Sequence, residues 1–126
     1  LVRSLDLTTS DAMAQEIANA AANNDSVGGR VLCHITGVPA GLGEPVFDKY
    51  DALLAQGIIS LGAVKAIEFG IGSKFAQLTG SQSNDPMGEG KKFLTNNAGG
   101  ILGGISTGEE IIFSLTVQAL LDVLQK

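Results

Sequence analysis

The sequence predicts an α+β fold arranged as a layer sandwich, and two observations favour this class. Segments of helical periodicity alternate with short apolar segments typical of strands, in the order helix, strand, helix, strand, loop, strand pair, helix. The chain has 126 residues, of which 44% are hydrophobic and 17% charged, so we expect a single domain with a buried core over residues 1–126. This order suits a layer sandwich better than a doubly wound sheet, and parallel crossovers between the strands stay open.

The N-terminal part of the chain predicts a helix, a strand and a loop. Ser10 is a suitable N-cap for a helix over residues 10–23, whose apolar residues fall at helical spacing. The β-branched, apolar stretch at residues 31–36 predicts a strand. Residues 37–45 (GVPAGLGEP) are rich in Gly and Pro and predict a loop.

A second helix is expected to begin near Asp48, and its apolar face includes Gly57. Because glycine costs a helix about 1 kcal/mol relative to alanine, Gly57 indicates close packing of this helix against another element. Residues 63–69 (AVKAIEF) alternate and predict a strand, with the side chains of residues 64, 66 and 68 on one side.

The last part of the chain combines short elements with polar turns. In order, we expect a helical turn at residues 74–78, a loop at 81–90, strands at 93–95 and 110–113, and a final helix at 114–125 that Ser114 caps. The apolar residues of the final helix follow the spacing of an amphipathic helix.

Charge and cysteine content narrow the class of protein. The formal net charge is −5 and the lysines and arginines form no cluster larger than Lys91 and Lys92, which argues against nucleic-acid binding. No apolar run approaches the roughly 18 residues of a membrane span. The single cysteine, Cys33, excludes an internal disulfide and fits the reducing cytoplasm.

Residues 96–108 (NNAGGILGGISTG) form the most unusual segment. Glycines let backbone N–H groups converge on an anion, or let a flat ligand approach closely, which indicates a candidate ligand-binding loop. The spacing matches neither a Walker A loop nor a dinucleotide-binding fingerprint. A tight crossing of small residues within a sheet is the commoner reason for such a pattern, so both interpretations stay open.

The polar and charged side chains give weaker evidence of a functional site than the glycine-rich segment does. Cys33 and His34 are neighbours in a predicted strand, so their side chains point to opposite faces and cannot act as a nucleophile and its base. One histidine, one cysteine and no local carboxylate do not make a metal site, and we interpret His34 as structural. The candidate acid–base groups are Glu68, Asp85, Glu109 and Glu110, and the candidate phosphate-binding cations are Lys65 and Lys74. Nothing in the sequence places two of these carboxylates together.

Six segments, in order and spacing, resemble chorismate synthase. They are residues 25–29 (DSVGG), 37–45 (GVPAGLGEP), 47–51 (FDKYD), 63–68 (AVKAIE), 80–85 (GSQSND) and 95–108 (TNNAGGILGGISTG). The resemblance implies the family's β-α-β sandwich, here in part, and its lyase activity in the shikimate pathway of aromatic amino-acid biosynthesis. That reaction is the anti-1,4-elimination of phosphate from 5-enolpyruvylshikimate 3-phosphate. It requires reduced FMN and takes place in a cytoplasmic, homotetrameric flavoprotein.

The resemblance also implies cofactor-binding residues. The turn before the 63–68 segment contacts FMN in the family, which makes Gly62 and Ala63 candidates. In the glycine-rich segment, Gly103 matches a flavin-contacting glycine, and Asn97 and Ala98 belong to the same motif. A glycine at the face of a flavin makes physical sense because a Cβ atom there would collide with the ring.

The departures from the family limit what the chain is expected to do alone. The family's His-Gly-Glu-Ser-His-Gly and Arg-His-Asp-Pro segments, which carry its proton-transfer histidines and a phosphate-binding arginine, do not occur in this sequence. We therefore assign no catalytic residue. We also expect a jump in the chain near Phe113 and Ser114, where the Arg-His-Asp-Pro segment would otherwise stand. The alternative function is a non-catalytic flavin-binding, phosphate-binding or structural fragment, with a generic oligomerisation domain as a third interpretation.

Overall fold

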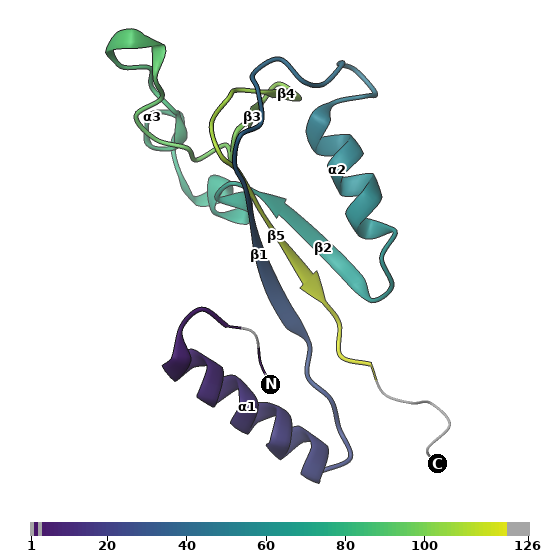
Figure 1. Ribbon diagram of the computed structural model, residues 1–126. Coiled ribbons are helices and arrows are strands. Elements are labelled where there is room, and N and C mark those ends of the chain that lie inside the picture. The colour runs from purple at the N-terminus through teal and green to yellow at the C-terminus, as the bar shows by residue number, and fades with distance from the viewer. Residues whose placement is uncertain (1, 3, 121–126) are drawn as a thin grey trace.

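A computed structural model describes residue 2 and residues 4–120 (Figure 1). Its helices and strands are α1 (Leu7–Ala22), β1 (Gly29–Ile35), α2 (Tyr50–Ile59), β2 (Val64–Phe69), α3 (Gly80–Ser83), β3 (Ile101–Leu102), β4 (Ile105–Ser106) and β5 (Ile111–Val117). Two 3-10 helices, Gly72–Gln77 and Glu89–Lys91, flank α3. Within these residues no helix combines the length and apolar character that crossing a membrane requires.

A three-stranded antiparallel sheet forms the centre of the fold, with β5 between β1 and β2. Both outer strands pair antiparallel to β5, so β1 and β2 run in the same direction on either side of it. The crossover from β1 to β2 contains α2, which makes a split β-α-β unit. Strands β3 and β4 form a separate short hairpin. The predicted α+β class is confirmed.

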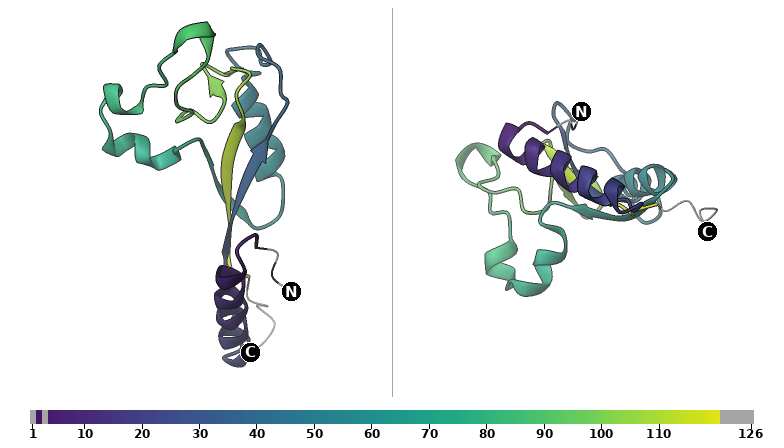
Figure 2. Two further views of the ribbon diagram at one scale, coloured as in Figure 1. Left: turned by 60° about the vertical axis from the view of Figure 1, so that its left-hand side comes forward. Right: turned by 90° about the horizontal axis from the view of Figure 1, so that it is seen from below.

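Helix α2 covers one face of this sheet, as the two views in Figure 2 show. The core consists of Ile101, Ile111 and Phe113, against which Tyr50, Leu54 and Ile58 of α2 pack, among others. The aromatic rings of Phe69 and Phe113 pack at a centroid distance of 5.8 Å and an angle of 47°. Since side chains alternate along a strand, residues 112, 114 and 116 of β5 face the other way, where the described residues provide no covering helix.

Helix α1 differs from its prediction at its first residue. It begins at Leu7, and the carboxylate of Asp6 accepts hydrogen bonds from the backbone N–H groups of Thr8 and Thr9 at 3.3 and 3.1 Å. Aspartate is a strong N-cap because it satisfies such unpaired donors. The expected cap, Ser10, lies inside the first turn, and its hydroxyl donates to the carbonyl oxygen of Val2.

Two predictions about the middle of the chain were wrong in detail. A Cβ atom on Gly57 would meet nothing within 4 Å, so this glycine does not mark a close contact. In β2, a register shift between Val64 and Ala66 breaks the alternation. As a result, Val64 is buried on the α2 side with Ile67, whereas Ala66 and Glu68 lie on the opposite face.

The C-terminal predictions were partly wrong. Strand β5 continues through Ser114 to Val117 because each of these residues pairs with β1, so Ser114 does not cap a helix. Residues 118–120 are not helical, and the rest of the expected final helix, residues 121–126, lies outside the described residues. Residues 93–95 form only an isolated bridge, between Met87 and Phe93. The jump near residues 113 and 114 stays a prediction.

Candidate functional site

Three glycines fix the path of the glycine-rich segment between β2 and β5. Gly99 and Gly100 have φ angles of 69° and 80°, a left-handed conformation that favours glycine. A Cβ atom on Gly99 would overlap backbone atoms of Gly70 and Ile112, and one on Gly70 would overlap the backbone of Asn97. The chain crosses itself here with no space for side chains. The tight-crossing interpretation therefore holds for this part of the segment.

Gly103 has a different environment. Together with Gly104 it forms the two-residue turn of the β3–β4 hairpin, and their φ values of 59° and 86° are those of a type I′ turn. Gly104 is buried against the side chain of Lys49, and its carbonyl oxygen accepts a hydrogen bond from Tyr50 N–H at 2.8 Å. Gly103 is exposed, and a Cβ atom there would meet nothing within 4 Å. A flat ligand can therefore approach its backbone.

Ser106 connects this hairpin through hydrogen bonds to the predicted loop at residues 37–45. Its hydroxyl accepts a hydrogen bond from Leu42 N–H at 2.9 Å and donates one to Pro39 O at 2.6 Å. Its backbone N–H donates to Leu42 O, and its carbonyl accepts from Gly41 N–H. The residue is 3% exposed, so the hairpin tip projects from a buried hydrogen-bond network.

Two polar side chains hold the segment that precedes the hairpin. The amide of Asn96 donates to Glu110 O and accepts from Gly100 N–H, both at 2.8 Å. The carboxylate of Asp85 accepts from the hydroxyl of Thr95 at 2.6 Å and from two backbone N–H groups, of Asn97 at 2.7 Å and Ala98 at 2.8 Å. Partial burial raises the pKa of Asp85, but these hydrogen bonds outweigh it, and the pKa lies below its ordinary value of 3.8.

Gly62 and Ala63 lie elsewhere, in the turn between α2 and β2. Ala63 has a φ of 68°, and its carbonyl oxygen accepts a hydrogen bond from Gln118 N–H at 2.9 Å. Gly62 is exposed with open space around it. Gly103 lies near the N-terminus of α2, where Tyr50 begins the helix. The ten residues of α2 separate the two positions by about 15 Å along the helix axis.

The structure thus divides the five predicted cofactor-binding residues into two groups. Asn97, Ala98 and Gly103 lie at the end of the sheet where β5 begins, and Gly62 and Ala63 lie at the end where β5 stops. Figure 1 shows the β3–β4 hairpin at the first of these ends and the turn between α2 and β2 at the other.

Two contacts between a basic and an acidic side chain were missed because they depend on strand register. His34 Nδ1 lies 3.0 Å from Glu110 Oε1, and Cys33 faces the core on the opposite side of β1. Arg30 donates to Glu68 at 3.0 Å and to the buried hydroxyl of Ser114 at 2.8 Å, across all three strands.

The carboxylate of Glu68 also accepts hydrogen bonds near the start of the 3-10 helix Gly72–Gln77. Its Oε1 accepts the backbone N–H of Ser73 at 3.0 Å. Hydrogen bonds from Ser73, followed by the charge of Arg30, hold the pKa of Glu68 below its ordinary value of 4.5. Glu68 and Glu110 therefore each contact a basic side chain of β1.

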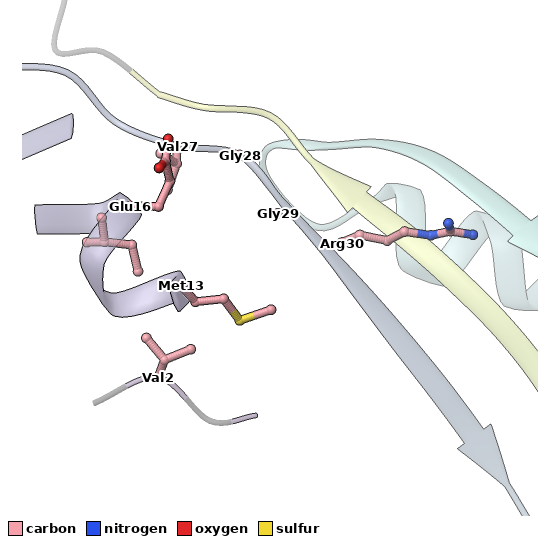
Figure 3. Close-up of a pocket in the computed structure, with 8 residues that line it drawn as sticks. Val2, Met13, Glu16, Val27, Gly28, Gly29 and Arg30 are labelled. Carbon is pink, nitrogen blue, oxygen red and sulfur yellow. The ribbon is translucent and has the colours of Figure 1, made fainter. Parts of the chain in front are cut away.

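A groove of about 270 Å³ lies between α1 and the start of β1, away from these residues. Met13 and Ile17 of α1 line it together with residues 27–30, and it contains none of the five predicted site residues. Figure 3 shows Met13 pointing toward β1 and Arg30 pointing away from α1, along the sheet. The groove is therefore a gap beside the helix and not the candidate flavin site.

Comparisons with known proteins give the family. A sequence model of chorismate synthase matches residues 1–126. The chorismate synthase of Nitratidesulfovibrio vulgaris (strain DSM 19637 / Miyazaki F) is 55% identical over 105 residues, which cover 83% of this chain and 30% of that protein. The chorismate synthase of Methanococcoides burtonii is 49% identical over 120 residues, covering 93% of this chain and 33% of that protein.

A solved structure agrees with these sequence matches. A crystal structure of chorismate synthase superimposes with a TM-score of 0.82 and 30% sequence identity, over 90% of this chain and 35% of that one. The chain spans about a third of the length of these relatives. Matches over most of the chain in sequence and in fold establish that it belongs to the chorismate synthase family.

Proposed function

We propose that this chain is part of a chorismate synthase, a lyase of aromatic amino-acid biosynthesis in the cytoplasm. The reaction is the anti-1,4-elimination of phosphate from 5-enolpyruvylshikimate 3-phosphate, in which a C–O bond and a ring C–H bond break and a C=C bond forms. The observation that carries the proposal is the identity of 49–55% to named chorismate synthases over most of the chain. Reduced FMN would lend an electron to assist departure of the phosphate and recover it afterwards.

The part of the flavin pocket on this chain consists of Asn97, Ala98 and Gly103. Three properties of these residues support the proposal. Gly103 is exposed and presents bare backbone, the Asn97–Ala98 backbone is held rigidly by hydrogen bonds, and all three residues lie at one end of the sheet. These residues fit a flat ring better than a phosphate, since they provide backbone surface and no cation.

Gly62 and Ala63 are proposed as a second flavin contact. Their distance from Gly103 along α2 means that the two groups touch different parts of one flavin, or flavins held between different copies of the chain. A homotetramer, as proposed for this family, would supply the second geometry. FMN added to the isotopically labelled protein is expected to shift the amide resonances of Gly103 and of Gly62. Shifts at Gly103 alone would remove Gly62 and Ala63 from the proposal.

A non-catalytic role for this stretch is the second candidate. Three carboxylates that could act as acids or bases are engaged in structural contacts: Glu68 with Arg30, Glu110 with His34, and Asp85 with backbone N–H groups. The chain also spans only a third of its relatives. It would then contribute scaffold and flavin contacts, with the chemistry carried by the rest of the enzyme.

A chimera tests the two candidates. The corresponding third of the Nitratidesulfovibrio vulgaris relative is replaced by this chain, and the product is assayed anaerobically with reduced FMN and 5-enolpyruvylshikimate 3-phosphate. Formation of chorismate, followed by absorbance, is expected, and the isolated 126-residue chain is expected to give none. A folded chimera that binds FMN without turnover would favour the non-catalytic candidate. Turnover by the isolated chain would show that the family segments it lacks are dispensable.

A further inference from the structure

Asp85 lies in the polar loop between α3 and β3, and it accepts hydrogen bonds from two atoms of the glycine-rich segment and one atom of Thr95, which precedes it. Both carboxylate oxygens are used: Oδ1 accepts from Thr95 Oγ1 and Asn97 N–H, and Oδ2 accepts from Ala98 N–H. The donors lie 10, 12 and 13 residues away in the sequence, so these bonds close the loop onto the segment. Sequence reasoning identified Asp85 only as one of several candidate acid–base groups.

The hydrogen bonds of Asp85 restrain the orientation of two consecutive peptide groups. On the opposite side, the carbonyl oxygen of Asn97 accepts Ile71 N–H at 2.9 Å. The backbone of Asn97 is therefore held through its donor and through its acceptor. Among the residues that the structure describes, the side-chain amide of Asn97 has no hydrogen-bond partner, and its direction follows from the backbone that carries it.

The chemistry of these contacts requires a carboxylate. Three donors converge on one side chain, and an ionised carboxylate provides two acceptor oxygens and no donor. An asparagine would turn an N–H group toward one of the backbone N–H groups, so at least one contact would be lost. Such charge-assisted hydrogen bonds are stronger than neutral ones. The lowered pKa of Asp85 agrees with an ionised carboxylate in these contacts.

We propose that Asp85 is a positioning residue of the flavin site, which fixes the Asn97–Ala98 backbone and thereby the surface that these residues present to the flavin. The inference rests on the proposed flavin contacts of Asn97 and Ala98 and adds the residue that holds them. Asp85 acts through hydrogen bonds to the backbone and does not itself touch the flavin or the substrate.

The test compares three variants of the 126-residue chain. Asp85→Asn removes the carboxylate. Glu89→Gln removes a negative charge in the same loop, where no hydrogen bond of the Glu89 side chain occurs among the described residues. Thr95→Val removes the hydroxyl bond to Asp85 but leaves both backbone contacts.

Two properties are measured for each variant. The amide resonances of Asn97 and Ala98 are followed during an acid titration without flavin, and FMN affinity is measured by quenching of its fluorescence. In the unmodified chain both amides are expected to titrate together, with a midpoint below pH 3.8, as the carboxyl of Asp85 is protonated. Asp85→Asn is expected to abolish that titration and weaken FMN binding about tenfold, the effect of losing a charged hydrogen bond. Glu89→Gln and Thr95→Val are expected to keep the titration and bind FMN within about twofold of the unmodified chain.

The outcomes separate this inference from the proposed function. If the unmodified chain does not bind FMN, its proposed flavin contacts are wrong. The amide titration alone then tests whether Asp85 holds the backbone of Asn97 and Ala98. If the chain binds FMN and Asp85→Asn binds equally well, the positioning role is wrong. Equal weakening of binding by Thr95→Val and Asp85→Asn would show that the loss follows general destabilisation, and would overturn the inference as well.

Discussion

Replacing Ser106 with alanine tests how firmly the hairpin that carries Gly103 is attached. The hydroxyl is buried and makes two hydrogen bonds, from Leu42 N–H and to Pro39 O. Alanine keeps the backbone bonds of this residue but deletes both side-chain bonds, each worth about 1 kcal/mol net. We therefore expect the free energy of unfolding to fall by about 2 kcal/mol, and by about 3 kcal/mol if the partners find no water.

Urea denaturation measures this loss. With a slope of about 2 kcal/mol/M, the midpoint is expected to fall by about 1 M while the slope stays constant. Ser60→Ala is the matched control, because the hydroxyl of Ser60 makes one hydrogen bond, to Gly57 O, at an exposed position. It should cost less than about 0.5 kcal/mol. Equal midpoints for the two variants would refute the structural role assigned to the hydroxyl of Ser106.

Three further predictions follow from the glycines and the carboxylates. Gly99→Ala should prevent folding or lower the free energy of unfolding by more than about 3 kcal/mol, because its Cβ atom would overlap backbone atoms. Gly103→Ala should lower it by about 1 kcal/mol, for its positive φ alone. Thermal unfolding of both variants measures the difference. Gly57→Ala, at an exposed helical site with open space, should raise the free energy of unfolding by up to about 1 kcal/mol, and a lower melting temperature would contradict the structure. In the folded chain the pKa values of Glu68 and Asp85 lie below their ordinary values of 4.5 and 3.8. The two carboxylates therefore stabilise the fold fully above their ordinary pKa values, and this stabilisation is lost as the pH falls through their folded-state pKa values. Unfolding midpoints measured from pH 6 down to 3 should fall less steeply for Asp85→Asn than for the unmodified chain.

Local sequence patterns predicted those helices and strands that depend mainly on residues close in the sequence. The strand at residues 31–36 and the helix that follows Asp48 are present as β1 and α2. The expected helix does not begin at Ser114, for a specific reason. Residues 114–117 of β5 pair with β1 on one side and β2 on the other, and this pairing prevails over the helical spacing of their apolar side chains.

The glycine-rich segment shows how far a motif alone can be interpreted. Its sequence allowed a ligand loop or a tight crossing; the structure shows the tight crossing at Gly99 and Gly100, and the ligand loop stays a prediction. Gly99 and Gly100 are required for the crossing, and Gly103 is free at the hairpin tip. The distinction depends on which atoms lie opposite each glycine, and those atoms belong to segments far away in the chain.

The sequence by itself determined the α+β class, the positions of the main elements and the resemblance to chorismate synthase, because these follow from local periodicity and from contiguous motifs. Only the tertiary structure placed Asp85 against the backbone of Asn97 and Ala98, and only it separated Gly62 from Gly103 by the length of α2. These relations depend on strand register and loop closure between distant residues. Such long-range contacts leave no periodic signal in the sequence. The geometry of the candidate flavin site depends on these contacts, so only the tertiary structure could provide it.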